Sequence, residues 1–216
     1  MLLYAITNRR LLPGDESAQR SRLVELAKGW AQGGVHYIQV REKDLPLAEL
    51  QPLAARIVAA VRESAGATRV LVNGPAQLAI DVAADGVHLL GGLGAAAVRA
   101  AQQVYARSGQ EAVVSAACHS AEEIRQATGA SLLLFSPVFE KIAGEKAIIG
   151  QGLAGLRAAA EMAKPVPVLA LGGVTEKNAA ACAQAGAAGV AAIRLFIGEG
   201  WRKLIEADPP SMRPST

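Results

Sequence analysis

The sequence predicts an α/β fold, a (β/α)8 TIM barrel, and three observations lead to this prediction. Short apolar runs alternate with longer stretches of helical period, which is the pattern of helices covering a parallel sheet. The alternation repeats eight times; a doubly wound sheet would give a similar alternation, but the count favours a closed barrel. The length of 216 residues lies within the range of a single barrel.

The predicted strands are short runs rich in Val, Leu, Ile and Ala, bounded by polar residues or glycine. They are residues 2–7, 37–41, 70–73, 86–89, 113–118, 132–136, 168–171 and 190–193. Helices are expected at residues 21–32, 46–64, 75–82, 95–106, 121–127, 153–163 and 176–185, with a short one near Trp201. One barrel domain is expected to cover residues 1–207, and residues 208–216, rich in Pro and Ser, to form a flexible C-terminal tail.

Three of these helices begin at recognisable start signals. Ser120 followed by Glu123 has the spacing of a capping box. Pro75 suits a first helical turn, and Thr175 can cap a helix that begins at Glu176. We therefore expect helices to start at these positions.

The composition excludes several classes of protein. Apolar residues make up 51% of the chain and aromatic residues only 4%, so Ala, Val, Leu and Ile must fill the core. The net charge of +3 comes from scattered basic residues, which predicts no nucleic-acid partner. No apolar run approaches the roughly 18 residues of a membrane span, and no secretory signal is recognisable. Cys118 and Cys182 cannot form a disulfide framework or a zinc motif and fit a reduced, cytoplasmic location.

Hydrogen-bonding residues or paired glycines stand at the ends of the first seven predicted strands. In chain order they are Thr7 and Asn8; Gln39, Arg41 and Lys43; Asn73; His88; His119; Ser136; and Gly172 with Gly173. In a TIM barrel the chemistry takes place at the carboxyl ends of the strands, because only the βα loops surround an open mouth. Any single residue here could be a cap or turn residue, but together they predict a polar ring at the mouth.

Arg41 and Lys43 are the candidate anion-binding side chains. On a continuing strand two residues apart share one face, so both would point to the mouth. Arg suits bidentate contact with phosphate or carboxylate, and Lys supplies a point charge. The alternative is that "REKD" is a loop of alternating charge that pairs with itself.

Gly172 and Gly173, in "ALGGV", end the seventh predicted strand. Paired glycines can expose backbone N–H groups, and barrels often bind phosphate at the loops after strands seven and eight. A tight turn into the next helix would equally explain two adjacent glycines.

The chain contains three histidines, His36, His88 and His119. His36 precedes the second strand, where a structural role is expected. His88 ends the fourth strand, and its position fits either the core or the mouth. His119 lies just beyond the fifth strand, and an imidazole with an ordinary pKa near about 6.5 suits proton transfer at neutral pH. An ordinary loop histidine is the alternative for His119.

Nine short motifs follow one another along nearly the whole chain: "YAIT", "YIQVREKD", "VLVNG", "DGVHL", "CHS", "SPVF", "GLAGL", "VLALGGV" and "AGAAGVAAI". In this order they resemble the thiamine phosphate synthase superfamily. The resemblance implies two activities on one fold. One is the synthase, which joins hydroxymethylpyrimidine pyrophosphate to thiazole phosphate, and the other is the TenI-like thiazole tautomerase.

Departures from the synthase pattern bear on the choice between these activities. A synthase neutralises a departing pyrophosphate, which requires Mg²⁺ held by carboxylates. The family pattern places one aspartate after the asparagine of strand three and another shortly after "HLG". Here those regions read Gly74 in "VNGP" and "HLLGGLGAAA", with no acid. After "PVF", where the pattern has threonines and a lysine, this chain has Glu140 and Glu145, although Lys141 or Lys146 could still reach an anion.

The tautomerase pattern matches at the same points, with Asn73-Gly74, His119-Ser120 and "VFE" at residues 138–140. The resemblance implies that His119 is the general acid/base that converts a dihydrothiazole tautomer into the aromatic carboxythiazole phosphate. It also implies that the phosphate rests on the backbone of four residues, and that Arg41 and Lys43 meet the carboxylate or a second anionic group. The four are Gly172, Gly173, Ala192 and Ile193.

The leading hypothesis is therefore a thiazole tautomerase whose partner is a small thiazole phosphate, with no metal and no cofactor. Mg²⁺ would be required only for the first alternative, a divergent thiamine phosphate synthase. The second alternative is a non-catalytic regulator that binds thiazole phosphate. No membrane partner is expected, and the sequence leaves open whether the chain forms a homo-oligomer.

Overall fold

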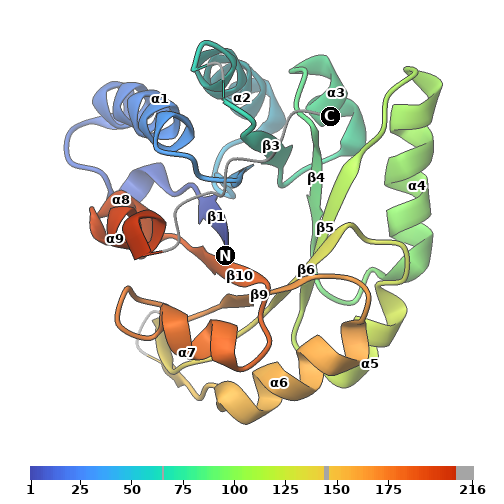
Figure 1. The fold of residues 1–216 in the computed structure, drawn as a ribbon. Helices are drawn as coiled ribbons and strands as arrows, with labels where there is room; N and C mark the ends of the chain where they lie inside the picture. Colours follow the sequence, from blue (N-terminus) through green and yellow to red (C-terminus); the bar gives the residue numbers. More distant parts are fainter. Residues whose placement is uncertain (65, 144–145, 208–216) are drawn as a thin grey trace.

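Eight parallel strands close into a barrel surrounded by helices in the computed structural model, which describes residues 1–64, 66–143 and 146–207 (Figure 1). The strands are β1 (Leu2–Ile6), β2 (Tyr37–Val40), β3 (Arg69–Val72), β4 (Gly86–Leu89), β5 (Val113–Cys118), β6 (Leu132–Phe135), β9 (Val168–Leu171) and β10 (Gly189–Ala192). They pair in this order, and β10 closes the ring on β1 in the register Leu2 to Gly189. The predicted TIM barrel is confirmed.

Helices alternate with the strands and cover the outside of the barrel (Figure 1). They are the 3₁₀ turn η1 (Arg9–Leu11) and the α-helices α1 (Glu16–Gln32), α2 (Leu47–Arg62), α3 (Ala76–Asp81), α4 (Gly94–Arg107), α5 (Ala121–Gln126), α6 (Gly152–Ala163), α7 (Ala179–Gln184), α8 (Arg194–Ile197) and α9 (Gly200–Ala207). None of them combines the length and apolar character needed to cross a membrane. The predicted tail at residues 208–216 lies outside the described residues.

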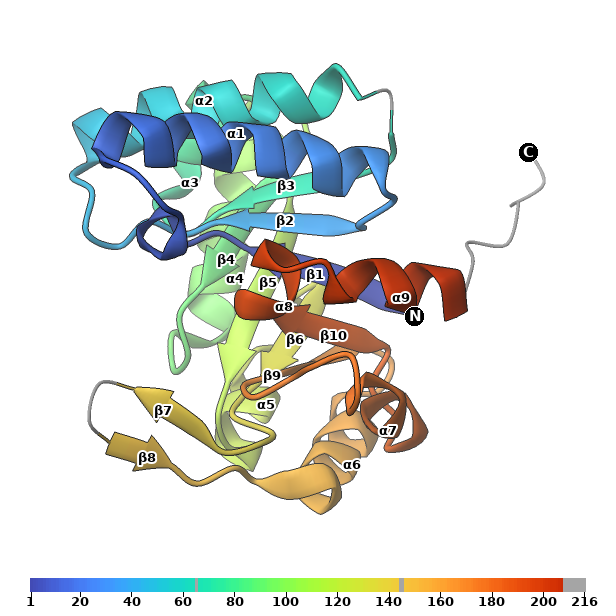
Figure 2. The same ribbon diagram turned by 90° about the vertical axis from the view of Figure 1, so that its left-hand side faces the viewer.

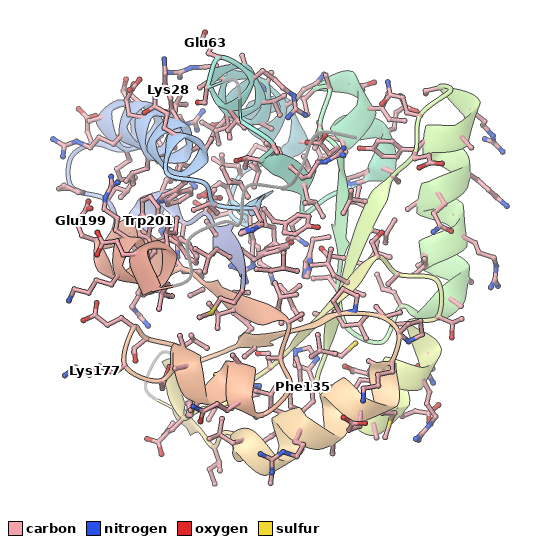
Figure 3. All side chains as sticks on the ribbon, in the orientation of Figure 1. Lys28, Glu63, Phe135, Lys177, Glu199 and Trp201 are labelled. Carbon is pink, nitrogen blue, oxygen red and sulfur yellow. The ribbon has the colours of Figure 1, made fainter. Side chains whose placement is uncertain are left out.

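The core has two parts, because alternate residues of each strand point inward and outward. Six buried residues fill the interior of the barrel: Tyr4, Ile6, Leu132, Leu134, Leu169 and Ala191. The larger cluster lies between the strands and the helices, where Phe135 lies between β6 and α6 (Figure 3). The packed interior leaves the βα loops as the place for a site.

An antiparallel hairpin, β7 (Lys141–Ala143) with β8 (Lys146–Ile148), interrupts the connection from β6 to α6. The sequence analysis missed it, because two three-residue strands show too little alternation to be recognised. It projects at the end of the barrel opposite the N-terminus (Figure 2). This end carries the carboxyl ends of the strands, so the hairpin stands beside the mouth.

Several helix starts differ from the prediction. Helix α1 begins at Glu16 rather than at residue 21, because Asp15 accepts a hydrogen bond from the Ala18 N–H. Pro75 precedes α3 instead of lying in its first turn. The cap expected at Thr175 is wrong, since α7 begins only at Ala179. The cap at Ser120 is confirmed: its side chain accepts from the Glu123 N–H at 3.2 Å and starts α5.

Candidate active site

The polar residues of the barrel interior form a chain across four strands. Gln39 Nε2 donates to the Tyr4 hydroxyl at 3.1 Å, Tyr4 contacts Ser115 Oγ at 3.0 Å, and Ser115 Oγ contacts His88 Nδ1 at 2.8 Å. Gln39 Oε1 is buried and has no partner among the described residues. Gln39 and His88 therefore form the floor of the site, and Gln39 keeps one acceptor free for a ligand or water.

His88 is a buried, neutral member of this chain. Its side chain is only 7% exposed, and burial, followed by the positive charges of Arg41 and Lys43, lowers its pKa to about 3. The Asn73 amide donates to the His88 carbonyl at 3.2 Å and joins the ends of β3 and β4. His88 thus belongs to the core network while lying under the two cations of the mouth.

Arg41 and Lys43 lie beyond β2, which ends at Val40, so the expectation of a continuing strand is wrong. The two side chains still influence each other: the positive charge of Arg41, followed by burial, lowers the pKa of Lys43. Desolvation lowers the pKa of the half-buried Arg41. No ion pair to either side chain exists among the described residues. A bound anion would relieve this repulsion.

The acidic residues of "REKD" are held by Arg9, a residue that the sequence analysis did not single out. The buried Arg9 guanidinium pairs with Glu42 at 3.0 Å and with Asp44 at 2.7 Å. Thr7 Oγ1 donates to Glu42 at 2.7 Å and accepts from the Arg41 N–H at 2.8 Å. The loop therefore does not pair with itself, and its two cations stay free. A signal was present, because "NRR" follows the first strand at the same end of the barrel as "REKD".

His119 is half-exposed just beyond β5, and the side chains of Glu123 and Gln151 hold it. Glu123 Oε2 accepts from the His119 N–H at 2.6 Å and lies 2.9 Å from Nδ1. Gln151 Nε2 donates to the His119 carbonyl at 3.1 Å and to the Ser136 carbonyl at 3.3 Å. No partner of His119 Nε2 is present in the described part of the chain. The free nitrogen is the one that could exchange a proton with a ligand.

Gly172 and Gly173 form a tight turn that leaves no room for side chains. Both have positive φ, +94° and +67°. A Cβ would lie 2.8 Å from Pro137 at the first position and 2.7 Å from the Phe139 Cβ at the second. Asn178 Nδ2 donates to the Gly173 carbonyl at 3.0 Å, a brace that the sequence analysis missed. The turn explains the glycines, and their N–H groups have no acceptor among the described residues.

The remaining predicted residues lie in different surroundings. Ser136 is buried at the end of β6. Ile193 packs at the rim of the inner cluster and directly precedes α8. Ala192 belongs to the outer cluster instead, so only its backbone could contact a ligand at the mouth. The side chains of Lys141 and Lys146 lie outside the described residues.

The residues at the mouth do not fit a Mg²⁺ site. The loops after β3 and β4 carry no acid at Gly74 or from residue 90 to residue 98. Of the neighbouring carboxylates, Glu42 and Asp44 bind Arg9, and Glu123 binds His119. No cluster of three His, Cys, Asp or Glu side chains suited to a metal occurs within the described ranges.

Comparison with known proteins identifies the relatives of this chain. The sequence model described as thiamine monophosphate synthase matches residues 3–196. The chain belongs to this family. It is 36% identical to a thiamine-phosphate synthase of Moorella thermoacetica over 91% of this chain and 88% of that protein. It is 35% identical to a thiamine-phosphate synthase of Methanoculleus marisnigri over 92% of this chain and 88% of that one.

Solved structures agree with this membership of the thiamine monophosphate synthase family. The thiamine phosphate pyrophosphorylase of Pyrococcus furiosus superposes with a TM-score of 0.73 and 29% identity, covering 94% of this chain and 90% of that one. A 3-hexulose-6-phosphate synthase reaches a TM-score of 0.65 at 22% identity and shares the fold alone. The chain is thus a TIM barrel of an enzyme family whose named relatives are thiamine-phosphate synthases.

Proposed function

We propose that this chain is a thiazole tautomerase of thiamine biosynthesis. His119 Nε2 removes a proton from a ring carbon of the dihydrothiazole tautomer, the ring becomes aromatic, and the proton returns to the exocyclic carbon. Substrate and product have the same composition, so the reaction has no leaving group. The observation that carries the proposal is the combination of a clamped His119, with Nε2 free, and loops after β3 and β4 that lack acids.

The anionic groups of the substrate have matching partners at the mouth. Arg41 and Lys43 repel each other and form no ion pair with the described residues, which supports a role in binding the substrate carboxylate. The free N–H groups of Gly172 and Gly173, together with the backbone of Ala192 and Ile193 before α8, suit the phosphate. The proposed site needs no cofactor.

The second candidate is a thiamine phosphate synthase, and the names of the relatives favour it. Joining a pyrimidine pyrophosphate to thiazole phosphate releases pyrophosphate, whose charge a metal ion ordinarily neutralises. The loops after β3 and β4 carry no acid, and Glu42, Asp44 and Glu123 are committed to Arg9 and His119, so these residues do not fit such an ion. This chemical mismatch is the reason for ranking the tautomerase first.

Two assays on the purified chain distinguish the candidates. In the first, the dihydrothiazole phosphate tautomer is supplied and formation of the aromatic thiazole is followed by absorbance. We expect acceleration that falls by about 10²- to 10⁴-fold in His119→Ala, as for loss of a general acid/base. Circular dichroism of the variant checks that the barrel is folded, and unchanged turnover in folded His119→Ala would overturn the proposal.

The second assay supplies thiazole phosphate, pyrimidine pyrophosphate and Mg²⁺ and measures thiamine phosphate. We expect none above the uncatalysed background. Robust formation of thiamine phosphate would establish the synthase instead. Binding of thiazole phosphate without turnover in either assay would favour a non-catalytic regulator.

A further inference from the structure

We infer that Glu123 is a positioning residue that fixes the tautomer and orientation of His119, so that Nε2 is the basic nitrogen. The catalytic part of this inference rests on the proposed function, whereas the tautomer is a property of the free protein. The two residues are close in sequence: His119 directly precedes the capping residue Ser120, and Glu123 lies in the first turn of α5.

A single carboxylate oxygen makes both contacts. Glu123 Oε2 lies 2.6 Å from the His119 backbone nitrogen and 2.9 Å from Nδ1. In an ordinary capping box, Glu123 would return to the N–H of the capping residue Ser120. Here it reaches one residue further back and joins the backbone and the ring of His119.

The chemistry of the pair decides the tautomer. An ionised carboxylate only accepts hydrogen bonds, so the contact at Nδ1 requires a proton on that nitrogen. In the neutral imidazole the lone pair is then on Nε2. The partner of one ring nitrogen thus selects the other as the base, which is the logic of an acid that orients a catalytic histidine.

The loop after β4 closes the Nδ1 side of the ring. A Cβ on Gly91 would lie 2.7 Å from His119 Nδ1, 2.9 Å from Cε1 and 3.0 Å from Glu123 Oε2. The φ of Gly91 lies outside the left-handed region, so the backbone conformation does not demand glycine there. A Cβ here would instead force the His119–Glu123 pair to shift.

The neighbouring acid, Glu122, provides a matched control. Its carboxylate accepts from Arg125 at 2.9 Å and from Gln126 at 2.8 Å, along the same helix and away from His119. Glu122→Gln therefore removes a charge from the same helical turn without touching the histidine.

Nitrogen-15 NMR of the imidazole rings tests the tautomer without any substrate. The three histidines give few signals, and His119→Ala identifies those of His119. We expect the Nδ1–H form of neutral His119 in the wild type and in Glu122→Gln, and a shift to the Nε2–H form in Glu123→Leu. In Glu123→Gln the amide oxygen can still accept, so the Nδ1–H form should be largely kept. An Nε2–H wild type, or no change in Glu123→Leu, would overturn the inference while leaving the His119→Ala result intact.

Kinetics on the same variants test the consequence for turnover. We expect kcat in Glu123→Leu to fall by about 10- to 100-fold with KM nearly unchanged, as for a misplaced catalytic group. Glu123→Gln should restore most of kcat, and Gly91→Ala should lower it with Glu123 still present. A shifted tautomer with unchanged kcat would overturn the positioning role, and absence of wild-type tautomerase activity would overturn the proposed function instead.

Discussion

At the scale of the residue, His88 makes the stability of the barrel sensitive to acid. Its pKa is lowered from 6.5 to about 3 in the folded chain, because it is buried beneath Arg41 and Lys43. The unfolded chain takes up a proton below about pH 6.5 that the folded chain refuses. The stability that His88 contributes is therefore complete above the unfolded pKa and is lost as the pH falls towards about 3.

His88→Gln should remove this pH dependence. Between about pH 6.5 and pH 4.5 the wild type should lose up to about 1.4 kcal/mol of unfolding free energy per pH unit through this residue. Other groups titrate in both proteins, so the difference between the two slopes isolates His88. Urea titrations at several pH values measure it, and parallel slopes would show that His88 is not held neutral by the fold.

Some site residues could be predicted from the sequence, because they directly follow predicted strands. Arg41, Lys43, His119 and the Gly172–Gly173 pair follow strands, and strand ends meet at one mouth. Arg9 was missed although it follows the first strand, because its partners Glu42 and Asp44 lie more than thirty residues away and strand order does not say which side chains pair. The contact between Glu123 and His119 was only partly predictable: the capping-box spacing was recognised, but an ordinary capping box has the Glu123 carboxylate accept from the Ser120 N–H rather than from the His119 N–H.

At the scale of the element, the turn between β9 and α7 depends on Gly173 for two separable reasons. Its φ of +67° disfavours any side chain, and a Cβ would also collide with the Phe139 Cβ at 2.7 Å and the Glu140 carbonyl at 2.8 Å. Gly109 offers a matched control, because its φ is +70° but nothing lies within 4 Å of its Cβ position.

Gly109→Ala should lower the unfolding free energy by about 1 kcal/mol, because alanine is disfavoured in the left-handed region of backbone conformation. Gly173→Ala should cost about 1 to 3 kcal/mol more, because the backbone must also move. Chemical denaturation of both variants measures the difference. Equal losses of unfolding free energy in the two variants would contradict the close packing around Gly173.

Strands were predicted more accurately than helices, for a physical reason. Every barrel strand starts and ends within one residue of its predicted limits, since buried parallel strands are continuous apolar runs. The 3₁₀ turn η1 and helix α8 were missed because three or four residues show no helical period. Such short pieces form only through tertiary contacts, as with Phe196 of α8.

At the scale of the whole molecule, aromatic packing closes the seam between the first and last βα units. The Phe196 ring lies 6.2 Å from that of Trp30 on α1 and 6.3 Å from that of Trp201 on α9. Trp30 Nε1 donates to the Phe196 carbonyl at 2.8 Å. Figure 3 shows Trp201 on α9, beside α1.

Phe196→Ala should destabilise the entire barrel by about 3 to 5 kcal/mol, because Phe196 is fully buried between two indoles. Phe196→Leu keeps most of the volume and should cost less. Tryptophan fluorescence reports the seam and far-UV circular dichroism reports all helices. If residues 1–207 form one domain, as predicted, both signals should change in a single transition; separate transitions would mean that the seam opens on its own.

The pairing of β1 with β10 also has a consequence for synthesis on the ribosome. The first strand of the barrel bonds to the last, so one edge of β1 stays unpaired until the segment around Gly189 has been made. Contacts between distant parts of a chain form late, because closing a long loop costs entropy before the contact repays it. The nascent barrel therefore carries an open sheet edge until β10 has been translated, and exposed edges of this kind invite aggregation and chaperone binding.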